Sequence, residues 1–211
     1  LDSTAVYGNI PAGSTAVIDR GYCIRADLSM PDEHNIPFTM TATDGDSVWT
    51  SYFVITGHRP ITDFESLVID DASGNNNGFL DPGETANFQI TVRNNGTGDV
   101  FNLTVRLSSD NYNINIPNDY VTIGSLAAGS QTNIVFRNVS AELNTPQASN
   151  VNFSMAFTGD QYQHGSGFST VVGDLRFAPT GPDNYGYRIY DMYETIGHPA
   201  YNWIEIAPAA G

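Results

Sequence analysis

The sequence predicts an all-β protein made of tandem antiparallel β-sandwiches, of which the first is incomplete. Apolar and polar residues alternate along most of the chain, clusters of Gly, Pro, Asn and Asp separate the alternating runs, and no segment has the period of an amphipathic helix. Short strands at this spacing are typical of an Ig-like sandwich.

The clearest strand patterns lie in the middle of the chain. Residues 88–92 alternate between apolar and polar types, and a second alternating run covers 101–107 after the Asn- and Gly-rich segment 94–98. Two alternating runs around an Asn-Gly turn predict a β-hairpin. We expect further strands at 119–123, 131–137, 150–157 and 167–172, and around Cys23.

An internal repeat relates the N-terminal part of the chain to the module that follows it. The matching pairs of segments are 7–14 with 123–130, 35–40 with 150–155, and 53–57 with 168–173. The offset stays near 115 residues, which is about one Ig-like module, so the repeat predicts tandem domains. Residues 1–57 match only the second half of the following module.

Three regions are therefore expected. Residues 1–58 form the second half of an Ig-like sandwich and residues 61–173 form a complete sandwich. Residues 174–211 form a Tyr- and Pro-rich linker that opens a third module, or a tail packed on the second. Half a sandwich exposes an apolar face and unpaired strand edges. Two explanations stay open: the chain is a fragment of a longer array, or another chain supplies the missing strands.

Charge and composition exclude several classes of partner. Only 8 Lys and Arg face 23 Asp and Glu, for a net charge of −15, which argues against binding to nucleic acid or anionic lipid. The chain has no apolar run of 18 residues, so we expect no membrane insertion. Its single cysteine excludes a disulfide within the chain. The first residues lack the pattern of a signal peptide, so we expect that one was removed or that this is an internal piece of an extracellular protein.

Residues 70–84 are a candidate calcium site because they place oxygen-bearing side chains at alternating positions around Gly78. In EF-hand ligand order, Ser73 falls at the first position, where Asp is usual, so Asp70 or Asp71 takes that role if the loop bulges. The expected Ca²⁺ ligands are Asp70, Asp71, Asn75, Asn77, Phe79 (through its carbonyl), Asp81 and Glu84. The alternative is a polar turn without metal.

The loop and the strand after it resemble the CARDB-type Ig-like modules of bacterial and archaeal surface proteins. The resemblance rests on Pro82-Gly83-Glu84, the alternating strand and Asn94-Asn95-Gly96, and it extends through Ala128-Gly129-Ser130 and Pro31-Asp32-Glu33-His34. It covers roughly residues 1–173, and it is shared with modules appended to large secreted peptidases of the gingipain type. It implies an extracellular, all-β adhesion or spacer role.

The other reactive side chains form no catalytic pattern, so we expect no enzyme. The four histidines (His34, His58, His164 and His198) have no metal-ligand spacing, and Cys23 has no base to activate it. Four Asn-x-Ser/Thr sequons begin at Asn95, Asn102, Asn138 and Asn152. An aromatic group in the C-terminal region is read as a sugar-stacking platform or as core: Tyr185, Tyr187, Tyr190 and Trp203.

Together these patterns predict a non-catalytic adhesion or spacer module of a large secreted or cell-surface protein, with Ca²⁺ stiffening a domain junction near residues 58–84. A subunit of a self-assembling surface filament, completed by strand donation between chains, is the alternative. An accessory carbohydrate-binding region of a secreted enzyme is the third. The expected partners are neighbouring modules, identical chains or surface glycans.

Overall fold

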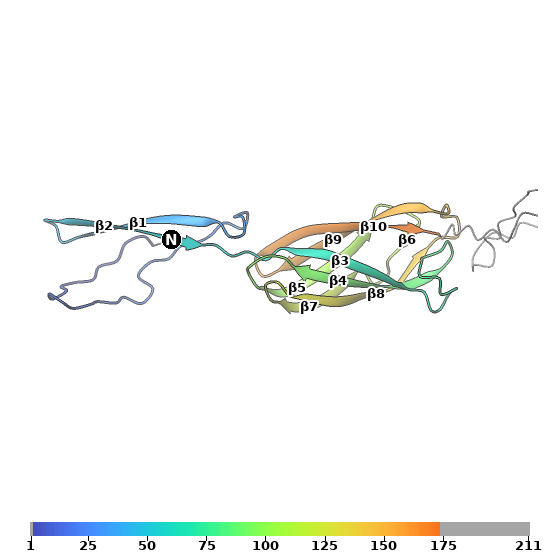
Figure 1. The fold of residues 1–211 in the computed structure, drawn as a ribbon, viewed down its shortest axis with the longest axis horizontal. Helices are drawn as coiled ribbons and strands as arrows, with labels where there is room; N and C mark the ends of the chain where they lie inside the picture. The colour runs from blue at the N-terminus through green and yellow to red at the C-terminus, as the bar shows by residue number, and fades with distance from the viewer. Residues whose placement is uncertain (1, 174–211) are drawn as a thin grey trace, which may run out of the picture. The chain divides into compact units, whose positions relative to one another are not determined.

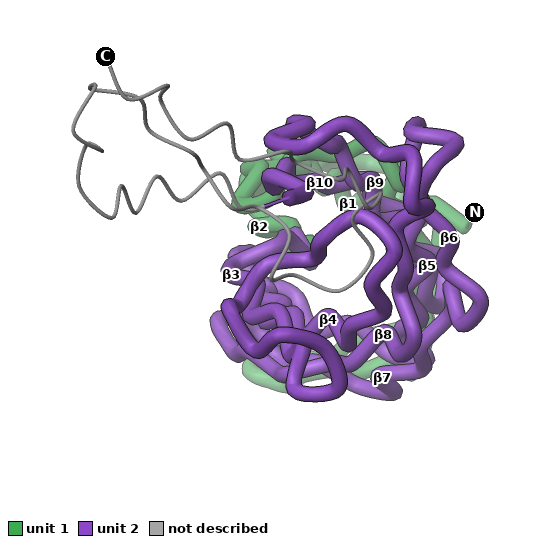
Figure 2. The backbone as a smooth tube through the Cα atoms, turned by 90° about the vertical axis from the view of Figure 1, so that its right-hand side faces the viewer, with its two compact units in different colours: residues 1–59 green, residues 60–211 purple. Residues whose placement is uncertain are grey.

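The computed structural model describes residues 2–173, and the C-terminal region 174–211, including the predicted aromatic platform, lies outside the described residues. Within 2–173 the chain forms ten β-strands and no helix, which confirms the all-β class (Figure 1). The strands are β1 (Asn35–Thr43), β2 (Val48–Thr56), β3 (Thr62–Asp70), β4 (Thr85–Asn94), β5 (Val100–Ser109), β6 (Ile114–Asn115), β7 (Tyr120–Leu126), β8 (Gln131–Ala141), β9 (Ser149–Gly159) and β10 (Tyr162–Val172). The chain divides into two compact units, residues 1–59 and 60–211 (Figure 2).

The second unit contains two four-stranded antiparallel sheets. One has the order β10-β9-β5-β7 and the other β3-β4-β8-β6. Strict alternation turns one side of each strand inward, so Phe88 of β4 and Phe153 of β9 are buried between the sheets. Their rings meet edge to face at 5.3 Å. The unit therefore is a β-sandwich with one apolar core.

The hairpin predicted from residues 88–107 is wrong, although both of its strands exist. β4 pairs with β3 and β8, whereas β5 pairs with β7 and β9 in the opposite sheet. The buried Asn94 side chain holds the crossover between the sheets, because its Oδ1 accepts from Gly96 N–H and its Nδ2 donates to the Gly98 carbonyl. Alternation specifies which face of each strand is buried, and two strands facing one core from opposite sheets show the same pattern.

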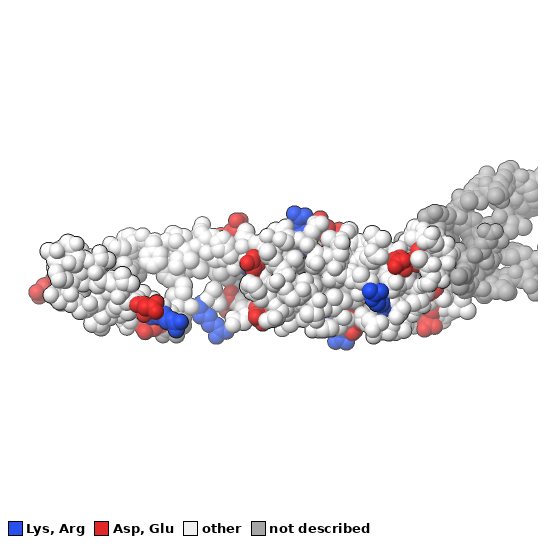
Figure 3. Space-filling view, turned by 90° about the horizontal axis from the view of Figure 1, so that it is seen from below, with Lys and Arg blue, Asp and Glu red and all other residues white. Residues whose placement is uncertain are grey.

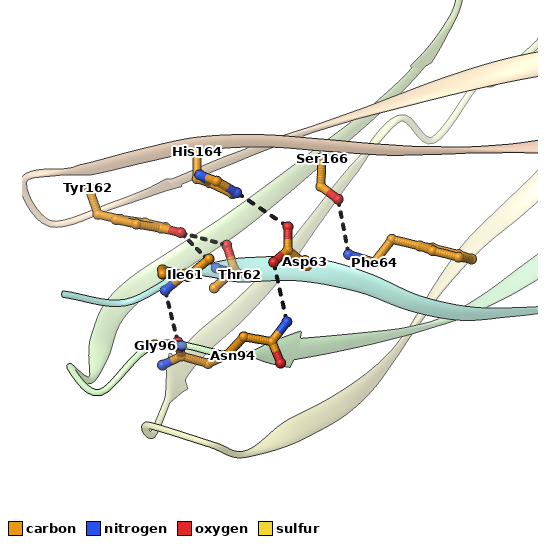
Figure 4. A network of polar contacts seen from close by, with 10 residues as sticks. Ile61, Thr62, Asp63, Phe64, Asn94, Gly96, Tyr162, His164 and Ser166 are labelled. Atoms are coloured by element: carbon orange, nitrogen blue, oxygen red, sulfur yellow. Dashed lines mark hydrogen bonds and ion pairs between the residues drawn. The ribbon is translucent and has the colours of Figure 1, made fainter. Parts of the chain in front are cut away.

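Side chains close the sandwich along the edge where β3 and β10 face each other across the two sheets (Figure 4). The Tyr162 hydroxyl accepts from the Thr62 N–H at 2.8 Å, and His164 Nε2 lies 3.3 Å from Asp63 Oδ1. Further along the same edge, the rings of Phe64 and Phe168 stack at 4.5 Å. These contacts hold together two edge strands that share no ladder.

The first unit contains one regular element, the β1–β2 hairpin. Its connection is an acidic turn, in which Gly45 has φ of 100° and the Asp44 carboxylate accepts from the N–H groups of Asp46 and Ser47. These backbone hydrogen bonds lower the pKa of Asp44. The strand expected around Cys23 is absent, since Cys23 makes only an isolated bridge to Asp2. None of the described residues in this unit is buried.

Candidate cation-binding loop

The segment 71–84 connects β3 to β4 and is fixed to two other strands at its end of the sandwich. Gly83 N–H donates to the Ala141 carbonyl at the end of β8, and the Ala141 N–H donates to the Glu84 carbonyl. Leu80 forms a parallel bridge to Val172, and its carbonyl accepts from Gly173 N–H at 2.9 Å. The Leu80 side chain is fully buried. The loop is therefore an anchored part of the sandwich.

This position corrects the expectation that the loop lies at the junction with the N-terminal region. The second unit begins at Pro60, and the segment 60–62 lies beside Asn94 at one end of β3, where Ile61 N–H donates to Asn94 Oδ1. β3 has nine residues, which at about 3.3 Å per residue separates its two ends by roughly 30 Å. The loop lies at the far end of β3, next to the end of β10 (Figure 1).

Local backbone requirements explain why this sequence makes a tight loop. Asn76, Gly78 and Gly83 have positive φ values of 57°, 83° and 83°, a region that Asn and Gly tolerate best. Gly74 has a different role, because a Cβ at this position would overlap the Glu84 carboxylate. The loop backbone is thus folded directly onto Glu84.

Three carboxylates of the loop are withdrawn from solvent. Asp71, Asp81 and Glu84 have exposed fractions of 2%, 1% and 3%. Asp71 Oδ2 accepts from Asn77 N–H at 2.7 Å, and Glu84 accepts from Asp81 N–H at 2.9 Å and Asn75 N–H at 3.2 Å. Asp81 Oδ2 accepts from the side-chain amides of Asn75 at 2.6 Å and Asn77 at 2.8 Å. Each carboxylate therefore has hydrogen-bond donors from the loop itself.

The electrostatics of the loop favour a bound cation or proton. Burial raises the pKa of Glu84, and the neighbouring charges of Asp81 and Asp71 raise it further, against the opposing effect of its two backbone hydrogen bonds. The sequence contains no Lys, Arg or His between Arg59 and Arg93. Basic side chains are also sparse on the face drawn in Figure 3 and form no patch there.

The structure brings together most of the expected ligands and places others elsewhere. Asp71 takes the place beside Gly78, with its carboxylate 3.2 and 3.3 Å from the Gly78 nitrogen. Asp70 instead accepts from the Asn87 side chain of β4, and the Ser73 hydroxyl donates to the Thr85 carbonyl. Phe79 N–H donates to Asn77 Oδ1. The loop therefore bulges between Asp71 and Asn75.

The donor chemistry fits a hard cation, but the ligands are not assembled around one point. Within residues 2–173, no group of three His, Cys, Asp or Glu side chains is arranged to hold a metal ion. The amide groups of Asn75 and Asn77 point toward Asp81. Carboxylate and amide oxygens are the ligands that Ca²⁺ takes, and calcium loops are flexible. Binding thus requires the two amides to turn their oxygens inward.

Among residues 2–173, the other candidate side chains are not gathered into a second site. His34 and His58 are exposed in the first unit, His164 pairs with Asp63, and Cys23 carries an exposed thiol. His198 lies outside the described residues. The four sequon asparagines are all exposed: Asn95, Asn102, Asn138 and Asn152. Sequence reasoning missed Leu80, although an apolar residue in the middle of a polar loop was the signal that pointed to it.

The second unit is an Ig-like β-sandwich module. The CARDB family model matches residues 65–160, which lie entirely in the second unit. CARDB modules are non-catalytic Ig-like sandwiches found in bacterial surface proteins. No curated protein matches the chain. Among residues 2–173, no helix is long and apolar enough to cross a membrane.

Proposed function

We propose that this chain is a non-catalytic adhesion or spacer region of a large secreted or cell-surface protein, and that Ca²⁺ stiffens its second unit. The observation that carries the proposal is the burial of three carboxylates in one loop without a basic residue in that stretch of sequence. Buried charges are costly unless they are paired or coordinate a metal. Asp71, Asn75, Asn77, Asp81 and Glu84 would hold the ion, which supplies positive charge and no reaction chemistry.

The loop contacts give calcium a mechanical role in this proposal. Because Leu80 is bonded to the end of β10 and Glu84 to the end of β8, an ion that fixes the loop also fixes both strand ends. The free energy of calcium binding then adds to the stability of the folded sandwich. The region beyond Gly173 is thereby attached to a stiff end of the module.

Thermal unfolding in calcium and in chelator tests the proposal. At a calcium concentration near 100 times Kd, binding adds about 2.7 kcal/mol, which corresponds to a rise in Tm of about 10 °C. Asp71→Asn should remove most of this rise, whereas the matched variant Asp70→Asn should retain it, because Asp70 faces Asn87. Equal Tm values of the unaltered protein in EGTA and in millimolar Ca²⁺ would contradict the calcium role.

A filament subunit completed by strand donation is the second candidate, and the exposure of the first unit favours it. No described residue of this unit is buried, and Trp49 and Phe53 are exposed on β2. Negative-stain imaging under native conditions separates the candidates, since only a filament subunit forms polymers. The third candidate, glycan binding, depends on the C-terminal aromatic group Tyr185, Tyr187, Tyr190 and Trp203, and a glycan array tests it.

A further inference from the structure

The first unit reproduces the geometry of the second half of the sandwich. β1 and β2 pair Phe38 with Phe53, and β9 and β10 pair Phe153 with Phe168, so the two hairpins have the same register at an offset of 115 residues. The rings of Phe38 and Phe53 stack at 5.2 Å with an interplanar angle of 9°, and those of Phe153 and Phe168 at 5.1 Å with the same angle. The two hairpins therefore have the same aromatic pair at the same position with the same ring geometry.

The turn that precedes this hairpin is also reproduced. Ser14 N–H donates to the Pro11 carbonyl at 3.0 Å, and Ser130 N–H donates to the Ala127 carbonyl at 3.1 Å. The glycine before each serine has a positive φ, 75° in the first unit and 70° in the second. The structural match thus begins near residue 11 and continues to the end of β2.

The second unit shows what covers the hairpin face in a complete module. Phe88 of β4 meets Phe153 edge to face, and Phe64 of β3 stacks on Phe168. As a result Phe153 is buried and Phe168 is partly buried, whereas Phe53, the counterpart of Phe168, is 45% exposed. Within the described residues of the first unit, no aromatic ring takes the place of Phe64 or Phe88.

Residues 15–26 form no strand, although the matching segment of the second unit does. Their counterpart is β8, whose ladder is formed with β4 along most of its length. In the first unit this segment is irregular, and its apolar residues face solvent, with Val17 87% and Ile24 55% exposed. A β-pattern in the sequence without a neighbouring strand leaves its backbone groups unpaired.

We propose that the first unit is a docking surface for a set of strands of the β3–β4–β5 type, supplied by a polypeptide segment that is not already folded into a sandwich. The strand corresponding to β4 pairs with residues 15–26, the strand corresponding to β5 pairs with the free edge of β1, and two aromatic side chains cover Phe38 and Phe53. Strands β3, β4 and β5 of the second unit cannot take this role themselves. β4 is already paired with β8, β5 is already paired with β9, and β3 is already in contact with β10.

One side of the hairpin is an apolar face of the kind that a second sheet covers in a complete module. This face carries Phe38, Met40, Trp49, Phe53 and Ile55. Trp49 is 56% exposed and Phe53 is 45% exposed, so the face is open to a partner. This inference does not depend on the calcium proposal.

The test adds the missing half to the protein from its own sequence. A second copy of residues 60–116 is placed directly before Leu1, because the pairs Pro11/Ala127 and Ser14/Ser130 set an offset of 116 at this end of the repeat, which puts Leu1 opposite Pro117. Trypsin cleavage after Arg20 and Arg25 then reports the exposed segment 15–26. We expect cleavage at both sites to slow by at least about 100-fold relative to the 211-residue chain. A segment paired within a folded module becomes accessible to the protease only when the module unfolds.

A matched control and a second measurement keep the result interpretable. In the control, the added copy carries Phe64→Ser and Phe88→Ser, and it should give no protection. Hydrogen exchange in β9 shows whether the original second unit remains folded in each fusion. Unchanged cleavage with a protected β9 overturns the proposal, as does equal protection by the control copy. Protection in the 211-residue chain alone, together with sedimentation as a dimer, also overturns it, since a second copy then covers the face.

Discussion

Replacing Leu80 by Ala should destabilise the second unit by about 3–4 kcal/mol. Leu80 is fully buried although it lies in a polar loop. The substitution removes three carbons at about 0.8 kcal/mol each, and the remaining cavity adds to this loss. The Leu80 carbonyl also receives the Gly173 N–H, so movement of the loop backbone releases the end of β10. A domain of this size has only about 5–15 kcal/mol of stability, which makes the effect large.

Urea unfolding of both proteins measures this loss, with the slope m expected to stay unchanged. Leu143→Ala is the matched control, because Leu143 is 52% exposed and its truncation should cost less than about 0.5 kcal/mol. Hydrogen exchange at Gly173 should accelerate in Leu80→Ala and not in the control. A loss below 1 kcal/mol, or an unchanged Gly173 amide, would refute the view that Leu80 anchors the loop to β10.

Three further outcomes follow from burial and hydrogen bonding. Because the folded pKa of Glu84 is raised, its contribution to stability is present below its unfolded pKa and is lost as pH rises through the folded value. Glu84→Gln in EGTA should therefore flatten the decline in Tm between acidic and neutral pH, and an unchanged pH profile would contradict the raised pKa. Gly74→Ala should lower the free energy of unfolding by about 1–3 kcal/mol, because the added methyl group displaces the Glu84 carboxylate from its backbone donors. Chemical unfolding measures this loss, and an unchanged stability would mean that the carboxylate can move without cost. Phe153→Ala should cost about 3–5 kcal/mol in unfolding experiments, whereas the same change at Phe38 should leave the stability of the second unit unaltered; equal losses would contradict the division into two units.

The sequence located the strands of the second unit well because burial of one face leaves a period of two. The runs expected at 131–137, 150–157 and 167–172 lie within β8, β9 and β10, and the run expected at 119–123 overlaps β7, which begins one residue later at Tyr120. The same signal failed at residues 22–26, where an apolar pattern forms no strand. A strand is stable only beside another strand, and the pattern of one segment contains no information on its neighbour.

The candidate loop shows the same division between local and tertiary information. Its turn residues and acidic side chains were visible in sequence, including Gly78 with its positive φ. The choice among Asp70, Asp71 and Ser73 depended on how the chain leaves β3, because successive strand residues point to opposite faces. That alternation directs Asp70 to Asn87 and leaves Asp71 to turn into the loop.

Sequence alone determined that this protein is all-β, that residues 1–57 repeat the second half of the following module, and that one loop gathers carboxylates among asparagines and glycines. These properties depend on side-chain periodicity and local backbone preference, which act within a few residues. Only the tertiary structure decided that β4 and β5 belong to opposite sheets, that the loop lies at the β10 end of the sandwich, and that the first unit leaves its hairpin face uncovered. Those features depend on which distant segments meet, and such meetings are set by packing of the whole core.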